Sequence, residues 1–107
     1  MGNNEALRAA EKMRQYIVEH LTEDILPEQA TRAAGYSLRH GSRLFKSATG
    51  KGLSEYTRLL RLSSAAQSLT DGNNNVLGVA LSHLYDSHEG FTKAFTSVFG
   101  ISPRVYR

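Results

Sequence analysis

The feature that most constrains this chain is a pattern from its middle that returns fifty residues later, near the C-terminus. Residues 37–57 and 87–107 share five identical positions at this offset, with Ser37, Phe45, Ser47, Gly50 and Tyr56 recurring as Ser87, Phe95, Ser97, Gly100 and Tyr106. A hydroxyl followed by a cation is repeated too, at positions 42–43 and 92–93. The repeat predicts two small structural units of the same design.

Each copy carries apolar residues at the spacing of one buried helix face. Positions i, i+3, i+4 and i+7 lie on one side of an α-helix. These positions are Gly41, Leu44, Phe45 and Ala48 in the first copy, and Phe91, Ala94, Phe95 and Val98 in the second. The opposite face is polar, and in the first copy it is mostly basic. Two equivalent polar surfaces suit one periodic partner, for which duplex DNA is the obvious candidate.

The chain shows no strand signals, and Gly, Pro and Asn divide it into segments with helical periodicity. We predict helices over residues 4–22, 27–34, 38–49, 53–70, 76–84 and 88–99, and a final turn from 103. Ser37, Ser87 and Ser102 are predicted N-caps, and either Asn74 or Asn75 caps the fifth helix. The fold class is therefore all-α with about seven helices.

The order of these helices predicts a single domain made of two helix–turn–helix subdomains. The first subdomain covers about 4–52, a long connector helix covers about 53–70, and the second subdomain covers about 74–107. The apolar stripe of the first helix is predicted to comprise Leu7, Ala10, Met13, Ile17 and Leu21, and that of the connector Tyr56, Leu59, Leu60, Ala66 and Leu69. Helical spacing favours a core role over a platform for stacking bases for six aromatic residues, namely Tyr36, Phe45, Phe91, Phe95, Phe99 and Tyr106.

Composition excludes several classes of function. The chain has no cysteine, and its four histidines form no metal-binding pair, so we expect no metal and no other cofactor. Asp86, Ser87 and His88 are the three residue types of a hydrolytic triad, but consecutive residues on one turn cannot adopt the geometry of that triad. No convergent acid–base set appears, and we therefore expect no enzyme activity. With no apolar run or signal peptide, the expected location is cytoplasmic, in association with the nucleoid.

Positive charge is concentrated in the middle of the chain. Residues 29–61 hold seven Lys or Arg and one Glu, a net charge of +6. Residues 1–28 hold three cations and six carboxylates, a net charge of −3, whereas residues 62–107 hold three of each and are neutral. A basic segment of this kind favours binding to a polyanion.

The polar face of the first copy has the chemistry of a recognition helix. Arg39, Ser42, Arg43 and Lys46 lie at i, i+3, i+4 and i+7, opposite the apolar stripe. An arginine can donate two parallel hydrogen bonds to O6 and N7 of guanine, and Arg39 and Arg43 lie one turn apart. Lys46 is better placed to contact phosphate. We expect this helix to enter the major groove.

The polar face of the second copy is less basic. It offers His88, Glu89, Thr92, Lys93 and Thr96. A carboxylate that faces DNA repels phosphate unless it accepts a hydrogen bond from the N4 amine of cytosine. Glu89 can alternatively stabilise the positive end of its own helix, and the sequence does not choose between these interpretations.

Ordered motifs along the chain resemble the AraC/XylS-type DNA-binding domain. Gly35-Tyr36-Ser37, Arg43-Leu44-Phe45-Lys46, Thr49-Gly50, Leu53-Ser54-Glu55-Tyr56 and Arg61-Leu62 resemble its first half. Residues 86–95 (DSHEGFTKAF), 99–103 (FGISP) and Tyr106-Arg107 resemble its C-terminal signature. The resemblance covers about 14–107.

The resemblance implies a sequence-specific transcription regulator with seven helices, which binds double-stranded DNA as a monomer at an asymmetric site. RNA polymerase is an implied candidate partner, and no small-molecule ligand is expected within this segment. The recognition helices are expected at about 38–49 and 88–99, in successive major grooves. The family's groove-facing positions correspond to Leu38, Arg39, Ser42 and Arg43, and to His88, Glu89, Thr92 and Lys93.

Three departures from the family pattern bear on the fold. Gly41 stands where a larger apolar residue is usual, and a helical glycine that also removes core volume should soften the first unit. Ala30 and Thr31 stand where a larger apolar residue followed by a small one is usual, and Leu84 stands where the second turn usually has glycine.

The alternative function is a helical protein-interaction module of helix–turn–helix ancestry with weak or no specific DNA reading. Gly41, Glu89 and the neutral second half favour it. The operator, the regulated genes and the direction of regulation do not follow from the sequence.

Overall fold

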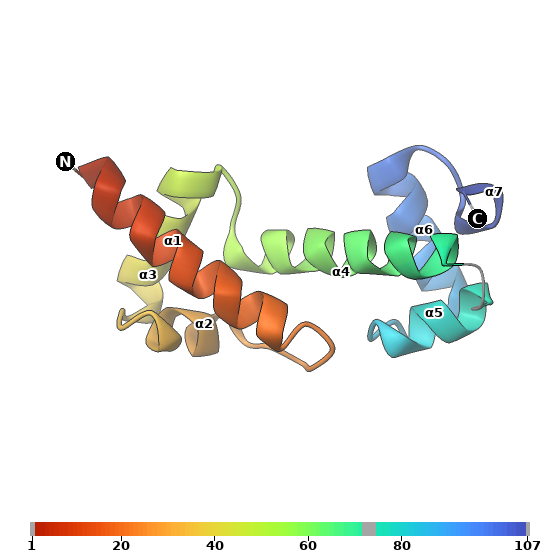
Figure 1. Cartoon of the computed structure of the whole chain (residues 1–107), viewed down its shortest axis with the longest axis horizontal. Coiled ribbons are helices and arrows are strands. Elements are labelled where there is room, and N and C mark those ends of the chain that lie inside the picture. Colours follow the sequence, from red (N-terminus) through yellow and green to blue (C-terminus); the bar gives the residue numbers. More distant parts are fainter. Residues whose placement is uncertain (1, 72–74, 107) are drawn as a thin grey trace. The chain divides into compact units, whose positions relative to one another are not determined.

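The computed structural model describes residues 2–71 and 75–106, and this part of the chain contains helices and no strand (Figure 1). In chain order the helices are α1 (Gly2–Glu19), α2 (Pro27–Ala33), α3 (Leu38–Thr49), α4 (Leu53–Thr70), α5 (Val76–Ser82), α6 (His88–Phe99) and α7 (Pro103–Tyr106). The predicted all-α class with about seven helices is confirmed. The largest difference in bounds concerns the first helix, which ends at Glu19 instead of residue 22. No described helix is both long and apolar enough to cross a membrane.

The chain divides into two compact units, Met1–Arg58 and Leu59–Arg107. The division lies inside α4, so the first turns of that helix belong to unit 1 and the rest to unit 2. Each unit has its own set of packed helices.

In unit 1, α1 packs against both α2 and α3. Its buried residues are Ala6, Ala9, Ala10, Met13 and Ile17. The prediction that Leu7 belongs to this face is wrong, because Leu7 is 57% exposed. Successive residues of an α-helix are about 100° apart around its axis, so Leu7 points well away from a face that contains Ala6 and Met13.

The contact between α2 and α3 depends on Gly41. A β-carbon at Gly41 would lie 2.6 Å from Cγ2 and 2.7 Å from Cβ of Thr31, and both residues are buried. The expected loss of core volume at Gly41 is therefore wrong. The larger side chain of Thr31, on the facing helix, fills the space that an apolar side chain at position 41 would otherwise occupy.

In unit 2, one apolar cluster joins the later part of α4 to α5 and α6. It consists of Leu62, Ala65, Ala66, Leu69, Val76, Val79, Ala80, Phe91 and Phe95, with Tyr85, Ala94, Val98 and Phe99 packed against it. Leu62 is fully buried although the predicted connector stripe omitted it, whereas Leu59 and Leu60 are only half-buried. Ala66 and Leu69 are buried as predicted, so the stripe is wrong only in its middle, where α4 passes from the core of one unit to that of the other.

The sequence repeat returns as a repeated tertiary contact. The rings of Phe45 and Tyr56 meet edge to face with centroids 5.0 Å apart, and those of Phe95 and Tyr106 do so at 5.4 Å. Phe45, Phe91 and Phe95 are fully buried, which confirms their predicted core role, whereas Tyr36 and Phe99 are half-buried and Tyr106 is 37% exposed. One matching aromatic pair in each unit thus holds α3 against α4 and α6 against α7.

Candidate nucleic-acid interface

Local hydrogen bonds set both ends of α3. The hydroxyl oxygen of Ser37 accepts a hydrogen bond from the backbone N–H of His40 at 3.1 Å, as the sequence predicted. At the other end Gly50 takes a left-handed conformation with φ of 79°, and its N–H donates to the carbonyl of Lys46. Side-chain N-caps and left-handed glycine ends are the usual ways to satisfy free backbone groups at helix termini.

The predicted groove-facing residues of α3 lie on its solvent side, which we call the α3 outer face. Arg39, Arg43 and Lys46 are exposed and Ser42 is half-buried. Leu38, at the start of the helix, is 45% exposed. No hydrogen bond or ion pair joins the side chain of Arg39, Arg43 or Lys46 to another described residue. Three cations on one helix face are therefore available to an external anion.

The turn before α6 resembles the one before α3 but is one residue longer. The N–H of Tyr36 donates to the carbonyl of Thr31 at 2.9 Å, and that of Tyr85 donates to the carbonyl of Ala80 at 3.0 Å. Leu84 has a φ of +69° where Gly35 has +87°, so a side chain stands in a conformation that favours glycine. Ser87 then caps α6 by accepting from the N–H of Gly90 at 3.0 Å.

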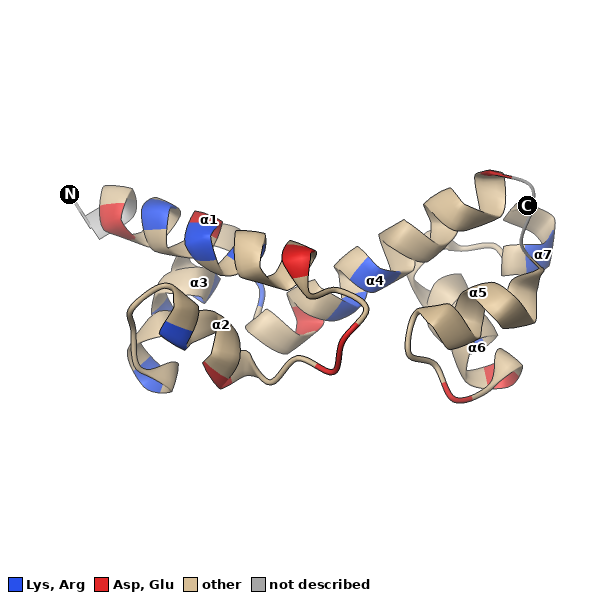
Figure 2. Cartoon of the chain, turned by 60° about the horizontal axis from the view of Figure 1, so that its bottom comes forward, with Lys and Arg blue, Asp and Glu red and all other residues tan. Residues whose placement is uncertain are grey.

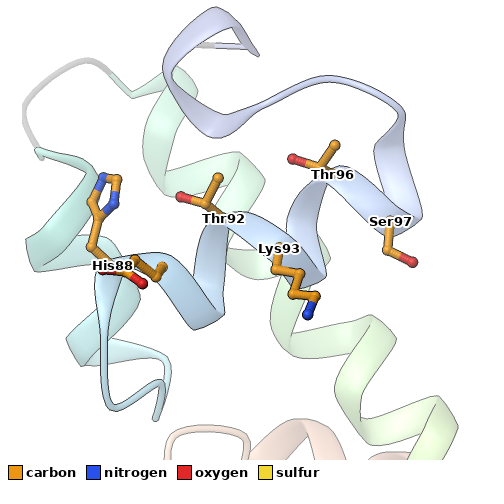
Figure 3. Close-up of a pocket in the computed structure, with 6 residues that line it drawn as sticks. His88, Thr92, Lys93, Thr96 and Ser97 are labelled. Atoms are coloured by element: carbon orange, nitrogen blue, oxygen red, sulfur yellow. The ribbon is translucent and has the colours of Figure 1, made fainter.

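The α6 outer face brings together the predicted residues of the second copy. His88, Glu89 and Lys93 are exposed and Thr92 is half-buried. With Thr96 and Ser97 they line an open hollow of about 500 Å³ (Figure 3). The sequence already indicated Thr96 on this polar face, whereas Ser97 was missed, although its helical spacing from Lys93 places it there.

Glu89 and Lys93 are one turn apart on this face, yet they form no ion pair. The Glu89 carboxylate lies in the first turn of α6, where it favours the positive end of the helix. It is also exposed and available to a hydrogen-bond donor. Both interpretations of Glu89 are compatible with this geometry.

The two outer faces have the same pattern of exposure. Burial, half-burial and exposure follow an identical order over residues 38–50 and 88–100. What differs is the chemistry, because positions 39, 43 and 46 are cationic in α3 whereas positions 89 and 96 of α6 carry a carboxylate and a hydroxyl. In Figure 2, Lys and Arg lie on α2, α3 and the first half of α4, and also on α1, where they are interspersed with Glu.

A buried polar atom distinguishes the α6 outer face. The hydroxyl oxygen of Thr92 is buried and has no hydrogen-bond partner among the described residues. The corresponding residue of α3 is Ser42, which carries no methyl group.

A second hollow, of about 230 Å³, lies beside α1 and the turn of unit 1. Its lining residues are Glu5, Arg8, Ala9, Lys12 and Tyr36. The Tyr36 hydroxyl donates to the Glu5 carboxylate at 3.3 Å. Burial, with a further contribution from the nearby Glu5 charge, raises the pKa of Tyr36 above its ordinary value. The contact ties α1 to the turn before α3.

Comparison with known proteins gives one family match and several relatives. A family described as "Helix-turn-helix domain" matches residues 30–107. An uncharacterised HTH-type transcriptional regulator of Bacillus subtilis, YbfP, is 31% identical over 100 residues, covering 94% of this chain. The chain spans only about a third (34%) of that relative's length.

Two solved structures are similar over nearly the whole chain. The first is a transcriptional regulator from Chromobacterium violaceum, one of the AraC-type DNA-binding domain-containing proteins, with a TM-score of 0.91 and 25% identity. The similarity covers 98% of this chain and 94% of that one. The second is the DNA-binding domain of AdpA in complex with a target DNA, with a TM-score of 0.80 and 27% identity over 92% of this chain and 88% of that one.

Proposed function

The chain belongs to the AraC/XylS-type family of helix–turn–helix DNA-binding domains, and on this premise we propose that it binds double-stranded DNA sequence-specifically and regulates transcription. The observation that carries the proposal is the α3 outer face. Arg39, Arg43 and Lys46 are exposed there without a partner from the described chain, on a helix whose other face is locked into the core.

The proposed roles follow from the chemistry of each face. Arg39 and Arg43 donate to guanine edges in the major groove, and Lys46 contacts phosphate. Ser42 and Leu38 contact neighbouring bases or sugars. On the α6 outer face, Thr92 and the rest of the predicted set contact the adjacent half of the site, so α3 and α6 enter successive major grooves of one duplex.

The charge distribution supports unequal contributions from the two faces. Affinity comes mainly from the basic segment 29–61, since phosphate contacts dominate binding free energy. The neutral second half refines the choice of sequence. We further propose that the chain binds DNA as a monomer on the bacterial nucleoid, in the cytoplasm, and that RNA polymerase is its protein partner.

The test is selection of bound sequences from a random duplex library, followed by a salt titration on the selected duplex. The proposal predicts an asymmetric consensus and an affinity that falls at least about tenfold between 50 and 200 mM salt. The variant Lys12→Ala, which removes an exposed cation from α1, serves as a control for charge alone.

No consensus and a shallow salt dependence would instead favour the protein-interaction module. Retention of purified RNA polymerase on the selected duplex, only in the presence of the chain, tests the proposed partner. Binding stoichiometry on the same duplex tests the monomer.

A further inference from the structure

Only part of the Thr92 side chain is accessible from outside the protein. The side chain is half-buried, but its hydroxyl oxygen is fully covered and has no hydrogen-bond partner among the described residues. The part of the side chain that an external molecule can touch is therefore its hydrocarbon part, which ends in the Cγ2 methyl group.

The neighbouring threonine on the same face has its side chain turned the same way, although it is exposed. Figure 3 shows Thr96 one turn beyond Thr92, with the oxygen and methyl group of the two side chains oriented alike. Both residues line the open hollow of the α6 outer face. The centre of this face is thus more apolar than its sequence of hydroxyl residues indicates.

The first unit has no counterpart to this apolar centre. Position 42 is serine and position 46 is lysine, so neither carries a methyl group at the matching places. Because the exposure pattern of the two helices is identical, the difference lies in what they offer to a partner. The α3 outer face offers hydrogen-bond donors, and the α6 outer face offers a methyl group between His88 and Lys93.

In the major groove, thymine is distinguished by an apolar group, its C5 methyl, whereas the other base edges present donors and acceptors. We propose that Thr92 is a specificity-determining residue that reads a thymine through contact between its Cγ2 methyl and the C5 methyl of the base. The inference rests on the proposed DNA-binding function and adds the identity of one base and the atoms that read it.

The buried hydroxyl is consistent with this role. The β-carbon of threonine carries both groups and its χ1 angle is restricted, so an outward methyl leaves the hydroxyl turned inward. Serine in the same place would lack the outward group, and valine would keep it. These two substitutions therefore separate the contribution of the methyl from that of the hydroxyl.

The experiment uses the whole chain and the duplex obtained by selection from the random library. Each thymine of the site is replaced in turn by deoxyuridine, which removes only the C5 methyl group. The wild-type chain should lose affinity about fourfold at one position, as expected for one buried methyl-sized group. Thr92→Val should show the same loss at that position.

Thr92→Ser should bind the unmodified duplex about fourfold more weakly and no longer distinguish thymine from deoxyuridine there. Thr96→Ser is the matched control, and it should keep the discrimination at the Thr92 position. Equal binding of thymine and deoxyuridine duplexes at every position overturns the inference. It is also overturned if Thr92→Val loses affinity for the selected duplex while Thr92→Ser retains it. Failure to select any sequence is a separate result, which overturns the proposed function itself.

Discussion

Gly41 lies so close to Thr31 that a β-carbon at position 41 would be 2.6 Å from the Thr31 methyl group. Unit 2 reverses these sizes at the matching positions, where the turn hydrogen bonds align Ala80 with Thr31 and the repeat aligns Phe91 with Gly41. In unit 1 the larger side chain is on α2 and the glycine is on α3, whereas in unit 2 the larger side chain is on α6 and the alanine is on α5. The two units therefore share a backbone design but not a packing solution.

The first prediction is that Gly41→Ala destabilises unit 1 by about 1–3 kcal/mol. Alanine gains about 1 kcal/mol in helix propensity, but overpacking against a fixed β-carbon costs more. Urea unfolding, followed by circular dichroism, measures the change. Thr31→Ala in the same background should recover part of the loss, since it removes the Cγ2 contact but keeps Cβ at 2.7 Å.

Gly90→Ala is the matched control for this substitution. A β-carbon there would meet only the Ser87 hydroxyl oxygen, at 3.2 Å, and His40 already occupies the equivalent place above Ser37. Its stability should stay within about 1 kcal/mol of wild type. If Gly41→Ala proved as stable as wild type, the tight contact between α2 and α3 would not limit packing in solution.

The second prediction concerns the turn of unit 2, where Leu84→Gly should stabilise the chain by about 0.5–1 kcal/mol. A left-handed conformation costs an L-residue about 1–2 kcal/mol, and the extra freedom of glycine in the unfolded chain offsets part of the gain. Leu84 is 42% exposed, and the loss of its covered apolar surface keeps the net gain at the lower end of this range. The reciprocal change Gly35→Ala should lower the melting temperature, and a fall with Leu84→Gly would contradict the argument.

The third prediction is that Thr92→Val raises the free energy of unfolding by about 1 kcal/mol. The substitution keeps the shape of the side chain and removes a buried hydroxyl that lacks a partner, whose burial costs about 1–3 kcal/mol. Thermal unfolding measures the gain. Thr96→Val, at an exposed position, is the control and should be nearly neutral, so equal effects at both positions would argue against a buried hydroxyl.

The fourth prediction separates two cations of the α3 outer face. Arg43→Ala should weaken binding to the selected duplex by about 1–3 kcal/mol and relax the preference at one base pair. Lys46→Ala should weaken binding to selected and unrelated duplexes alike, with a salt dependence shallower by about one unit of log–log slope. Titrations of both variants on both duplexes measure these changes. An Arg43→Ala variant with an unchanged footprint and preference would show that α3 is not the base-reading helix.

Much of the fold was already determined by the sequence. The caps Ser37 and Ser87 and the helix ranges 38–49 and 88–99 were predicted correctly, because capping depends on residues within one turn. Of the two alternatives for the fifth helix, Asn75 is the cap, whereas Asn74 lies outside the described residues. The outer faces of α3 and α6 also followed from helical spacing alone.

Only the tertiary structure decided which surfaces fit together. The exposure of Leu7, the burial of Leu62 and the filling of the Gly41 site by Thr31 depend on helices that are distant in sequence. For the same reason the sequence identified Thr92 as a polar position but not which of its two groups faces outward. Periodicity assigns a residue to one side of a helix, whereas the neighbouring helix decides how closely it is approached and which of its atoms remain exposed.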